Sequence, residues 1–311
     1  MSPLLIVILG PTASGKTELA LQIAGKFSGE IVNCDSLQLY RGFDIGTAKT
    51  APSLRRGIPH HLFDVLDPKK SYSAGDYARA AREVVADVSL RGRLPVVVGG
   101  TGFYLRALLE GLPDLPPRDE ALRARLVERE GRRTGSLHRV LQRLDPAAAE
   151  KVHVRDVQKV MRALEVRLLM GAPRTDQSFA TPLKGYRILQ IGLAPDRARL
   201  VEAIGIRTRE MFQAGLIDEV SGLLANGLTG SEKPFESLGY KQALLHLRGE
   251  LSLEDAITST EIETRQYAKR QLTWFRRDAE VHWLLGFGTE PDVIAEGLAI
   301  VAKQHEALSR D

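Results

Sequence analysis

Residues 10–17 carry the strongest chemical signal in the sequence, a Gly-x4-Gly-Lys-Thr pattern. The pattern lies between an apolar run, Leu4–Leu9, and a predicted helix, Glu18–Phe27. A loop of this kind between a strand and a helix binds phosphates, because its N–H groups and the positive helix N-terminus surround an anion. Within it Lys16 adds a positive charge and Thr17 can offer Mg2+ a hydroxyl ligand. The full segment reads Gly10-Pro11-Thr12-Ala13-Ser14-Gly15-Lys16-Thr17.

The pattern is typical of ATP-binding and other nucleotide-binding proteins, yet by itself it does not specify the polyphosphate. The alternative is a glycine-rich turn that binds nothing, and the strand–loop–helix context disfavours it. No Asn-Lys-x-Asp segment, which reads guanine, occurs in the sequence. A GTPase switch is therefore not expected.

A carboxylate follows the second predicted strand, since Glu30–Cys34 runs directly into Asp35-Ser36-Leu37-Gln38. In open α/β sheets, ligands bind outside the carboxyl ends of the strands. We therefore expect Asp35 to face the same crevice as the phosphate loop. Three roles remain open for it: a general base, a ligand of Mg2+, and a cap of a turn or helix.

The third predicted strand, Leu94–Val98, ends in Gly99-Gly100-Thr101-Gly102. Glycines at a strand end allow a backbone to approach a ligand closely. Thr101 stands where the next helix opens, so its hydroxyl can cap that helix or contact a substrate. The sequence leaves both roles open.

The order of apolar runs and helical stretches predicts an α/β fold with a parallel, P-loop NTPase-like sheet. Two later strands are expected at Arg187–Leu193 and Val281–Leu285. We assign 1–113 and 186–311 to this catalytic core and 114–185 to a helical insertion domain. Within the insertion, helices are predicted at Arg118–Gly131, Ser136–Arg143, Asp145–Val152 and Arg155–Met170. In the core they are predicted at Ala74–Arg91, Asp196–Gln213, Ile217–Ala225, Tyr240–Arg248, Ser252–Arg277 and the C-terminal end.

Composition limits the classes of protein that remain. The single cysteine, Cys34, excludes a disulfide framework and a zinc ribbon and fits a reducing cytosol. The predicted first strand leaves no room for a signal peptide, and no apolar run reaches the ~18–20 residues of a membrane span. We expect a cytoplasmic protein without membrane contact.

Positive charge is concentrated in the predicted insertion. The whole chain has a formal net charge of +4, whereas Arg118–Arg167 contains 13 Lys and Arg against 8 Asp and Glu, an excess of five. The helix Ser252–Arg277 adds a second set of basic residues interleaved with an aromatic one: Arg265, Lys269, Arg270, Trp274, Arg276 and Arg277. This pattern suits phosphate contacts and stacking on bases, and equally a solvated helix face with Trp274 in the core.

Taken together, these segments resemble the tRNA dimethylallyltransferases of the IPP transferase family. The resemblance includes the phosphate loop and continues, in order and with the spacing kept, to about Trp283. It rests on these segments: Asp35-Ser36-x-Gln38-x-Tyr40, Asp44–Lys49, His60-His61-Leu62, Tyr72-Ser73-Ala74, Val98-Gly99-Gly100-Thr101-Gly102-x-Tyr104, Asp145-Pro146 followed by Arg162–Val166, Gly239-Tyr240-Lys241-Gln242 and Arg265-Gln266-x-Ala268-Lys269-Arg270-Gln271-x-Thr273-Trp274. One segment, Pro234–Leu238, lacks the basic or small residue and the cysteine that the family often has before Gly-Tyr.

The resemblance implies transfer of a dimethylallyl group from dimethylallyl diphosphate to N6 of adenosine 37 in a tRNA anticodon loop. The phosphate loop, Gly10–Thr17, and Arg207 would then bind the diphosphate, with Mg2+ on Thr17. Asp35 would be the base, Lys16 would stabilise charge, and Thr101 would position N6 or a diphosphate oxygen. Arg209 is a second candidate for the place of Arg207.

The resemblance also implies a set of residues that contact the tRNA, whose anticodon loop would carry adenosines at positions 36, 37 and 38. A monomer is expected. These predicted contacts are Asp35, Ser36, Leu37, Gln38, Thr101, Arg123, Gln158, Lys159, Val160, Met161, Arg162, Gly239, Tyr240 and Lys241.

Three other functions share part of the pattern. A small-molecule P-loop kinase would use Asp35 to activate a hydroxyl. A prenyltransferase acting on free AMP or ADP would not need the basic insertion. An RNA-binding module would use the phosphate loop only to sense a nucleotide.

Overall fold

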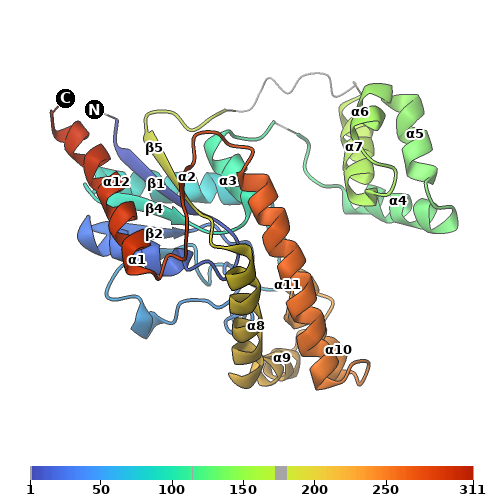
Figure 1. Cartoon of the computed structure of the whole chain (residues 1–311). Coiled ribbons are helices and arrows are strands. Elements are labelled where there is room, and N and C mark those ends of the chain that lie inside the picture. The colour runs from blue at the N-terminus through green and yellow to red at the C-terminus, as the bar shows by residue number, and fades with distance from the viewer. Residues whose placement is uncertain (1, 114, 172–180, 311) are drawn as a thin grey trace. The chain divides into compact units, whose positions relative to one another are not determined.

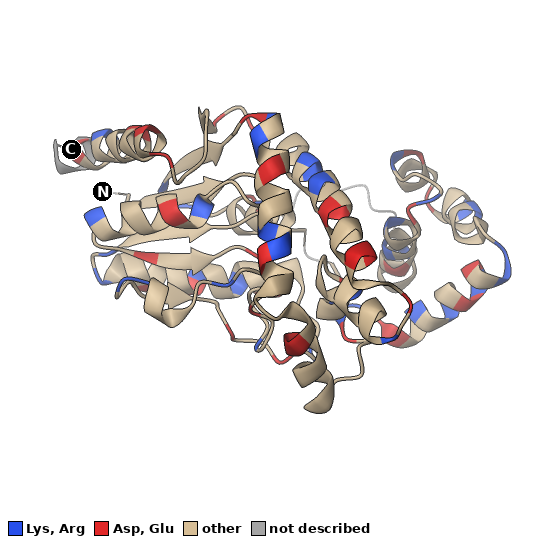
Figure 2. Ribbon diagram, turned by 60° about the horizontal axis from the view of Figure 1, so that its bottom comes forward, with Lys and Arg blue, Asp and Glu red and all other residues tan. Residues whose placement is uncertain are grey.

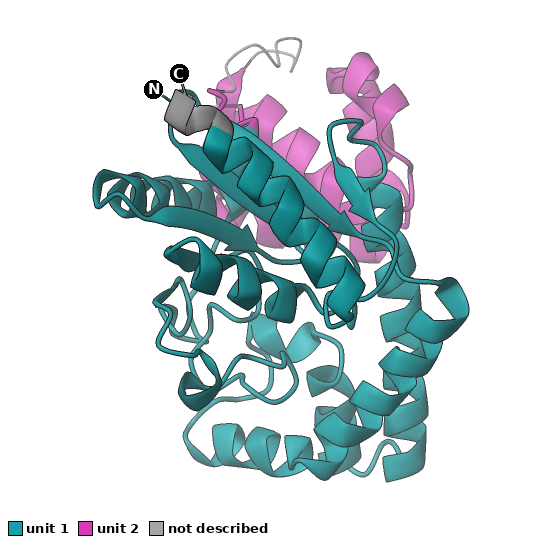
Figure 3. Ribbon diagram, turned by 60° about the vertical axis from the view of Figure 1, so that its left-hand side comes forward, with its two compact units in different colours: residues 1–109, 183–311 teal, residues 110–182 magenta. Residues whose placement is uncertain are grey.

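The computed structural model describes residues 2–113, 115–171 and 181–310. The chain divides into two compact units, one of Met1–Leu109 with Leu183–Asp311 and one of Glu110–Pro182, coloured separately in Figure 3. Each unit is described by itself.

The larger unit is built on six parallel strands in the order β3-β2-β4-β1-β5-β6 (Figure 1). The five predicted strands are present within a residue or two. The sequence did not predict β3, which is only two residues long. The strands are β1 Leu4–Leu9, β2 Gly29–Asn33, β3 His60–His61, β4 Leu94–Val98, β5 Arg187–Leu193 and β6 His282–Leu284.

All six residues of β1 are buried, because helices cover both faces of the sheet. Leu4, Ile6 and Ile8 share one core cluster with side chains of α1 (Lys16–Lys26) and α12 (Pro291–Arg310). The helices α2 (Ala74–Leu90) and α3 (Gly102–Leu109) pack together on the opposite face (Figure 1).

Four further helices of this unit pack against one another, namely α8 with α11 and α9 with α10, with α10 also contacting α11. They lie together in Figure 1. Each position was predicted from the sequence, and the observed ends differ by a few residues because terminal turns fray. The bounds are α8 Arg197–Gln213, α9 Leu216–Ala225, α10 Tyr240–Leu247 and α11 Leu253–Phe275.

The smaller unit consists of four helices around a cluster of its own: α4 Glu120–Arg132, α5 Ser136–Leu144, α6 Pro146–Lys151 and α7 Val157–Met170. Asp145 caps α6 by accepting the Ala148 N–H at 3.0 Å. Lys and Arg occur along all of its helices, interspersed with acidic residues (Figure 2).

In the part of the chain that the structure describes, no helix is both long enough and apolar enough to cross a membrane. The cytoplasmic location expected from the sequence stays a prediction.

Candidate active site

One cavity of about 560 Å³ lies within the larger unit, where the segments after β1 and β2 meet α8 and α11. The phosphate loop contributes Thr12 and Ala13, and the segment after β2 contributes Asp35, Ser36 and Leu37. The carboxyl ends of parallel strands meet at one edge of a sheet, so the predicted convergence is observed. The remaining walls combine polar groups with an apolar and aromatic lining that includes Tyr40, Tyr72, Tyr104, Ile204, Met211, Leu238 and Tyr267.

The phosphate loop is held in shape from several sides. Ala13 has a left-handed backbone with φ of 62°, and its methyl group packs against a cluster formed by α8, α11 and Phe287. The Ser14 carbonyl accepts the Gly288 N–H at 2.9 Å. Lys16 opens α1 and folds back, donating from Nζ to the Pro11 carbonyl at 2.6 Å. Thr17 is exposed in the first helical turn, where N–H groups lack partners within the helix.

Three charged groups face one another beside this loop. Arg207 reaches from α8 and lies 3.4 Å from the Thr12 hydroxyl, and its charge interacts with those of Lys16 and Asp35. Burial and, to a smaller extent, the charge of Arg207 lower the pKa of Lys16, the charge of Asp35 opposes both, and the net result is a pKa of about 7. Burial also lowers the pKa of Arg207. Two cations are thus gathered where an anion would compensate them.

Arg209, the second candidate for this role, points elsewhere. Its guanidinium lies 2.9 Å from the carboxylate of Glu261 on α11 and is largely exposed. Arg207 is therefore the arginine of α8 that serves the cavity.

Asp35 is oriented by its own backbone. Its Oδ1 accepts the Leu37 N–H at 2.9 Å. The buried Asn33 side chain accepts the Asp35 N–H at 2.8 Å and donates from Nδ2 to the Asp35 carbonyl at 3.1 Å. No hydrogen bond to Oδ2 occurs among the described residues, so this oxygen is available to a ligand. The turn-capping role and a catalytic role are compatible, because each uses a different oxygen.

The hydroxyl of Thr101 is engaged with the loop after β2. It accepts the Ser36 N–H at 3.1 Å, and it also interacts with the hydroxyl of Tyr267. Burial raises the pKa of Tyr267, and the charge of Asp35 raises it further, so its hydroxyl stays a proton donor. The structure therefore places Thr101 beside Asp35 and Ser36, within the predicted site.

The glycines before Thr101 allow protein groups to pack closely at this strand end. A Cβ on Gly99 would lie 2.1 Å from the Cys34 carbonyl oxygen, and a Cβ on Gly100 would lie 2.2 Å from Nε2 of Gln271. The expectation that these glycines also admit a ligand stays a prediction.

Not all predicted tRNA-binding residues are accessible. Val160 and Met161 are buried in the core of the smaller unit, and Tyr240 is fully buried against Phe43 with its hydroxyl on Glu219. Gly239 is also buried, at the N-terminus of α10. Because the protein's own core covers these four residues, none of them offers an exposed side chain for the predicted contact with tRNA, and that contact stays a prediction.

The other predicted contacts are at the surface or partly so. Gln158, Lys159 and Lys241 are exposed. In the cavity region, Gln38 is half-buried and donates from Nε2 to the Thr47 carbonyl at 3.0 Å. In the smaller unit, both Arg123 and Arg162 pair with the buried carboxylate of Glu165, at 3.2 and 2.6 Å. This carboxylate fixes the two arginines but also compensates part of their charge.

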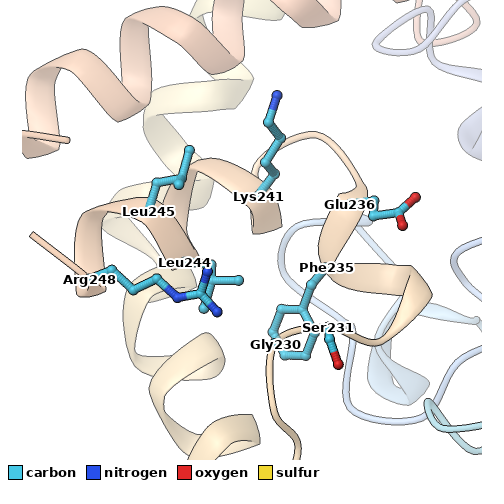
Figure 4. A pocket seen from close by; sticks show the side chains of 8 residues that line it. All are labelled: Gly230, Ser231, Phe235, Glu236, Lys241, Leu244, Leu245 and Arg248. Atoms are coloured by element: carbon cyan, nitrogen blue, oxygen red, sulfur yellow. The ribbon is translucent and has the colours of Figure 1, made fainter. Parts of the chain in front are cut away.

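A second, open pocket of about 460 Å³ lies beside α10 (Figure 4). Lys241 and Arg248 contribute basic groups, and Phe235 and Leu244 an apolar floor. It includes part of the segment that differs from the family pattern, Pro234–Leu238.

Sequence reasoning missed Tyr267 and Gln271. Both lie on α11, and their spacing of four residues places them on one helix face. The basic and aromatic pattern that the sequence does show, Arg270 and Trp274, lies on a neighbouring face of the same helix. Trp274 is 38% exposed and interacts with Arg277, so it is neither a core residue nor a fully solvated one.

Comparison with known proteins agrees with this geometry. The family model described as IPP transferase matches residues 38–278. A tRNA dimethylallyltransferase of Solibacter usitatus is 57% identical over 96% of this chain and 98% of its own, and one of Koribacter versatilis is 52% identical over the same shares.

Solved structures agree as well. The tRNA isopentenylpyrophosphate transferase of Bacillus halodurans superimposes with a TM-score of 0.73 at 37% identity, covering 99% of this chain and 98% of that one. A eukaryotic dimethylallyltransferase, described as acting on tRNA, gives a TM-score of 0.82 at 27% identity, covering 99% of this chain and 80% of that one. From the matching family model, the near full-length relatives and the shared fold, the chain belongs to the IPP transferase family.

Proposed function

We propose that this protein transfers the dimethylallyl group of dimethylallyl diphosphate to N6 of adenosine 37 in tRNA. The observation that carries the proposal is one cavity whose lining joins Arg207, the carboxylate of Asp35 and an apolar surface, with Lys16 close enough to interact with both charges. A kinase would need no apolar lining for its transferred group. A prenyl donor needs both parts, because it has an anionic and a hydrocarbon end.

The phosphate loop stabilises the leaving group in this mechanism. The C1–O bond of the donor breaks and its electron pair goes to the diphosphate, whose growing charge is met by Lys16, Arg207 and the first N–H groups of α1. Ser14 Oγ supports this role. It is fully buried and has no hydrogen-bond partner among the described residues, a need that a diphosphate oxygen would satisfy. The Thr12 N–H does not contribute, because it donates to Gln271 at 2.8 Å.

Asp35 acts on the acceptor. The exocyclic nitrogen of adenine is a poor nucleophile, and the new C–N bond forms on C1 as Asp35 Oδ2 takes one N6 proton. The products are prenylated adenosine, diphosphate and one proton. Thr101 holds the Ser36 backbone and thereby the wall on which the base would rest. Adenine must leave the stack of the anticodon loop to reach this cavity.

A divalent metal fits the chemistry of the loop. Mg2+ commonly takes one or two protein oxygens and completes its shell with phosphate oxygens and water. Thr17 is exposed in the first turn of α1 and would supply such an oxygen. No group of three or more His, Cys, Asp or Glu suited to a metal occurs in the described residues, so the diphosphate itself would supply the other ligands. When bound, Mg2+ would stabilise the charge of the departing diphosphate.

The smaller unit would provide phosphate contacts with the tRNA. Gln158, Lys159 and the partly exposed Arg123 and Arg162 are candidates, together with Lys241 of the larger unit. Contacts of this kind fix the register of an RNA without reading its sequence. Asp35, Ser36, Leu37 and Gln38 would line the adenosine.

The proposal is tested by incubating the protein with dimethylallyl diphosphate, Mg2+ and an unmodified tRNA that carries adenosines 36, 37 and 38. Nucleosides are then analysed by mass spectrometry. We expect C5H8 to be added to one adenosine. Parallel incubations with free AMP and with ATP separate the alternatives: prenylated AMP supports a mononucleotide prenyltransferase, and ATP consumption without transfer supports a kinase. Binding of tRNA without any product would indicate an RNA-binding module.

A further inference from the structure

One face of α11 contacts both loops of the active site. Tyr267, Gln271 and Trp274 follow at i, i+4 and i+7, and these spacings bring side chains to the same side of a helix. Tyr267 interacts with Thr101. Trp274 packs so closely on Gly102 that a Cβ there would lie 2.3 Å from its ring. Gln271 lies between them.

Gln271 forms a bridge between segments that are remote in the sequence. Its Oε1 accepts the Thr12 N–H of the phosphate loop at 2.8 Å, and its Nε2 donates to the Gly100 carbonyl at 2.8 Å. The side chain is only 6% exposed. The two ends of one amide group therefore bind two backbone groups, one partly buried and one buried, for which the described residues provide no other hydrogen bond.

The two bridged segments have different tasks in the proposed reaction. The phosphate loop holds the leaving group, and the segment that contains Gly100 and Thr101 supports the wall at Ser36 and Asp35. Displacement at C1 requires the nucleophile to approach within ~3–3.5 Å and opposite the leaving group, and a misplacement of ~1 Å can cost about 100-fold in rate. The rate of transfer therefore depends on the distance between the two segments.

We propose that Gln271 is a positioning residue that fixes the phosphate loop relative to the Thr101 segment, so that N6 and the leaving diphosphate lie in line. This inference rests on the proposed function. Gln271 contacts neither reacting atom and acts through the two backbone groups that it binds. Gly100 lacks a side chain because Nε2 of Gln271 occupies that space.

The test replaces Gln271 by a side chain of similar length that cannot form either hydrogen bond, Gln271→Met. We expect the single-turnover rate of transfer to fall about 10- to 100-fold. The Kd values for dimethylallyl diphosphate and for tRNA should stay within about threefold, because Lys16, Arg207 and the RNA-binding groups are intact.

A second readout separates positioning from simple loss of structure. With N6 misplaced, water competes for C1: the C1–O bond to diphosphate breaks, the water oxygen bonds to C1, and one proton goes to solvent. The fraction of donor recovered as dimethylallyl alcohol should therefore rise in Gln271→Met. A lower fraction of folded enzyme would reduce both products together and leave their ratio unchanged.

The matched control is Gln213→Met, the same substitution at an exposed position at the end of α8. It should leave the rate and the product ratio unchanged. If the wild-type protein transfers the prenyl group and Gln271→Met has the same rate and product ratio, the role of Gln271 is overturned while the proposed function stands. Absence of transfer by the wild-type protein would overturn the proposed function as well.

Discussion

At the scale of single residues, the site depends on three charged groups that burial brings together. Lys16 and Asp35 lie near the start of the chain and Arg207 lies in its second half, yet their charges act on one another in the folded protein. Two predictions concern Asp35 and Lys16.

Asp35→Asn should lower the single-turnover rate by about 10²–10⁴ while tRNA binding is retained. The amide keeps an oxygen for the Leu37 N–H, so the turn survives, but it cannot accept the N6 proton. Rapid-quench kinetics and tRNA binding measure the two effects. Asp67→Asn is the control, because Asp67 makes the same kind of turn with Lys69 outside the cavity. A loss of less than tenfold in Asp35→Asn would remove Asp35 as the base.

Lys16 should couple diphosphate binding to proton uptake. Burial and Arg207 lower its pKa to about 7, so near pH 8 the side chain of the free protein is mostly neutral. A bound diphosphate favours the charged form, and the protein must then take up a proton; near pH 6 it is already charged and uptake disappears. Affinity should therefore weaken as the pH rises above about 7.

Calorimetry with inorganic diphosphate, in buffers of different ionisation enthalpy, measures this uptake. Lys16→Met provides the reference, since titration of the ligand itself is the same for both proteins. Equal proton uptake by wild type and Lys16→Met would exclude Lys16 as the group that titrates.

At the scale of elements, a buried carboxylate links the edge strand β3 to its neighbour β2 and to the end of α2. Glu30 of β2 is buried and binds Arg91, which follows α2, and His61 of β3. The hydrogen bond from Arg91 and, to a smaller extent, that from His61 lower the pKa of Glu30 against the opposing effect of burial, and the net result is a pKa of about 2. A two-residue strand such as β3 depends on this kind of side-chain contact.

Glu30→Gln should reduce the free energy of unfolding at pH 7 by about 1–3 kcal/mol. Because the folded pKa is depressed, the stabilisation is fully present above the ordinary value of 4.5 and is lost as the pH falls toward 2. The difference between wild type and variant should therefore shrink over that interval. Urea unfolding followed by the fluorescence of Trp274 and Trp283, both in the larger unit, measures it.

The control for this prediction is Glu128→Gln, which removes an exposed pair with Arg132 and should change little. A constant difference between wild type and Glu30→Gln from pH 7 to pH 3 would contradict the assigned ion pair.

At the scale of the whole molecule, the chain combines a compact catalytic unit with a smaller basic one. Replacing Arg155 and Lys159 of the smaller unit by Gln should weaken tRNA binding and reduce the salt dependence of log K by about 0.7–0.9 for each tRNA phosphate that is no longer neutralised. Transfer at saturating tRNA should keep its rate, because the catalytic groups are untouched. Binding titrations at several salt concentrations measure the slope of log K against the logarithm of the salt concentration.

Arg93→Gln with Lys303→Gln is the matched control, because it removes the same charge from exposed positions of the larger unit at the start of β4 and on α12. An equal change of slope in both double variants would indicate a general charge effect and contradict specific contacts by the smaller unit.

Much of this protein follows from its sequence alone. The parallel α/β sheet, the positions of the long helices and the presence of Asp35 beside the phosphate loop were predicted, because periodic burial and strand-end placement are local or topological properties. The family resemblance added the expected reaction and the choice of Arg207.

Only the tertiary structure decided how groups remote in the sequence meet. It showed that Tyr240, Val160 and Met161, three of the residues predicted to contact tRNA, are buried. It also showed that Gly100 makes room for Gln271, a bridge across 171 and 259 positions that no local pattern encodes. The physical reason is that sequence periodicity reports which face of an element is apolar, whereas side-chain partners depend on which elements pack together. The phosphate loop is recognisable from eight consecutive residues, whereas Gln271, which binds its Thr12 N–H, lies 259 positions further along the chain.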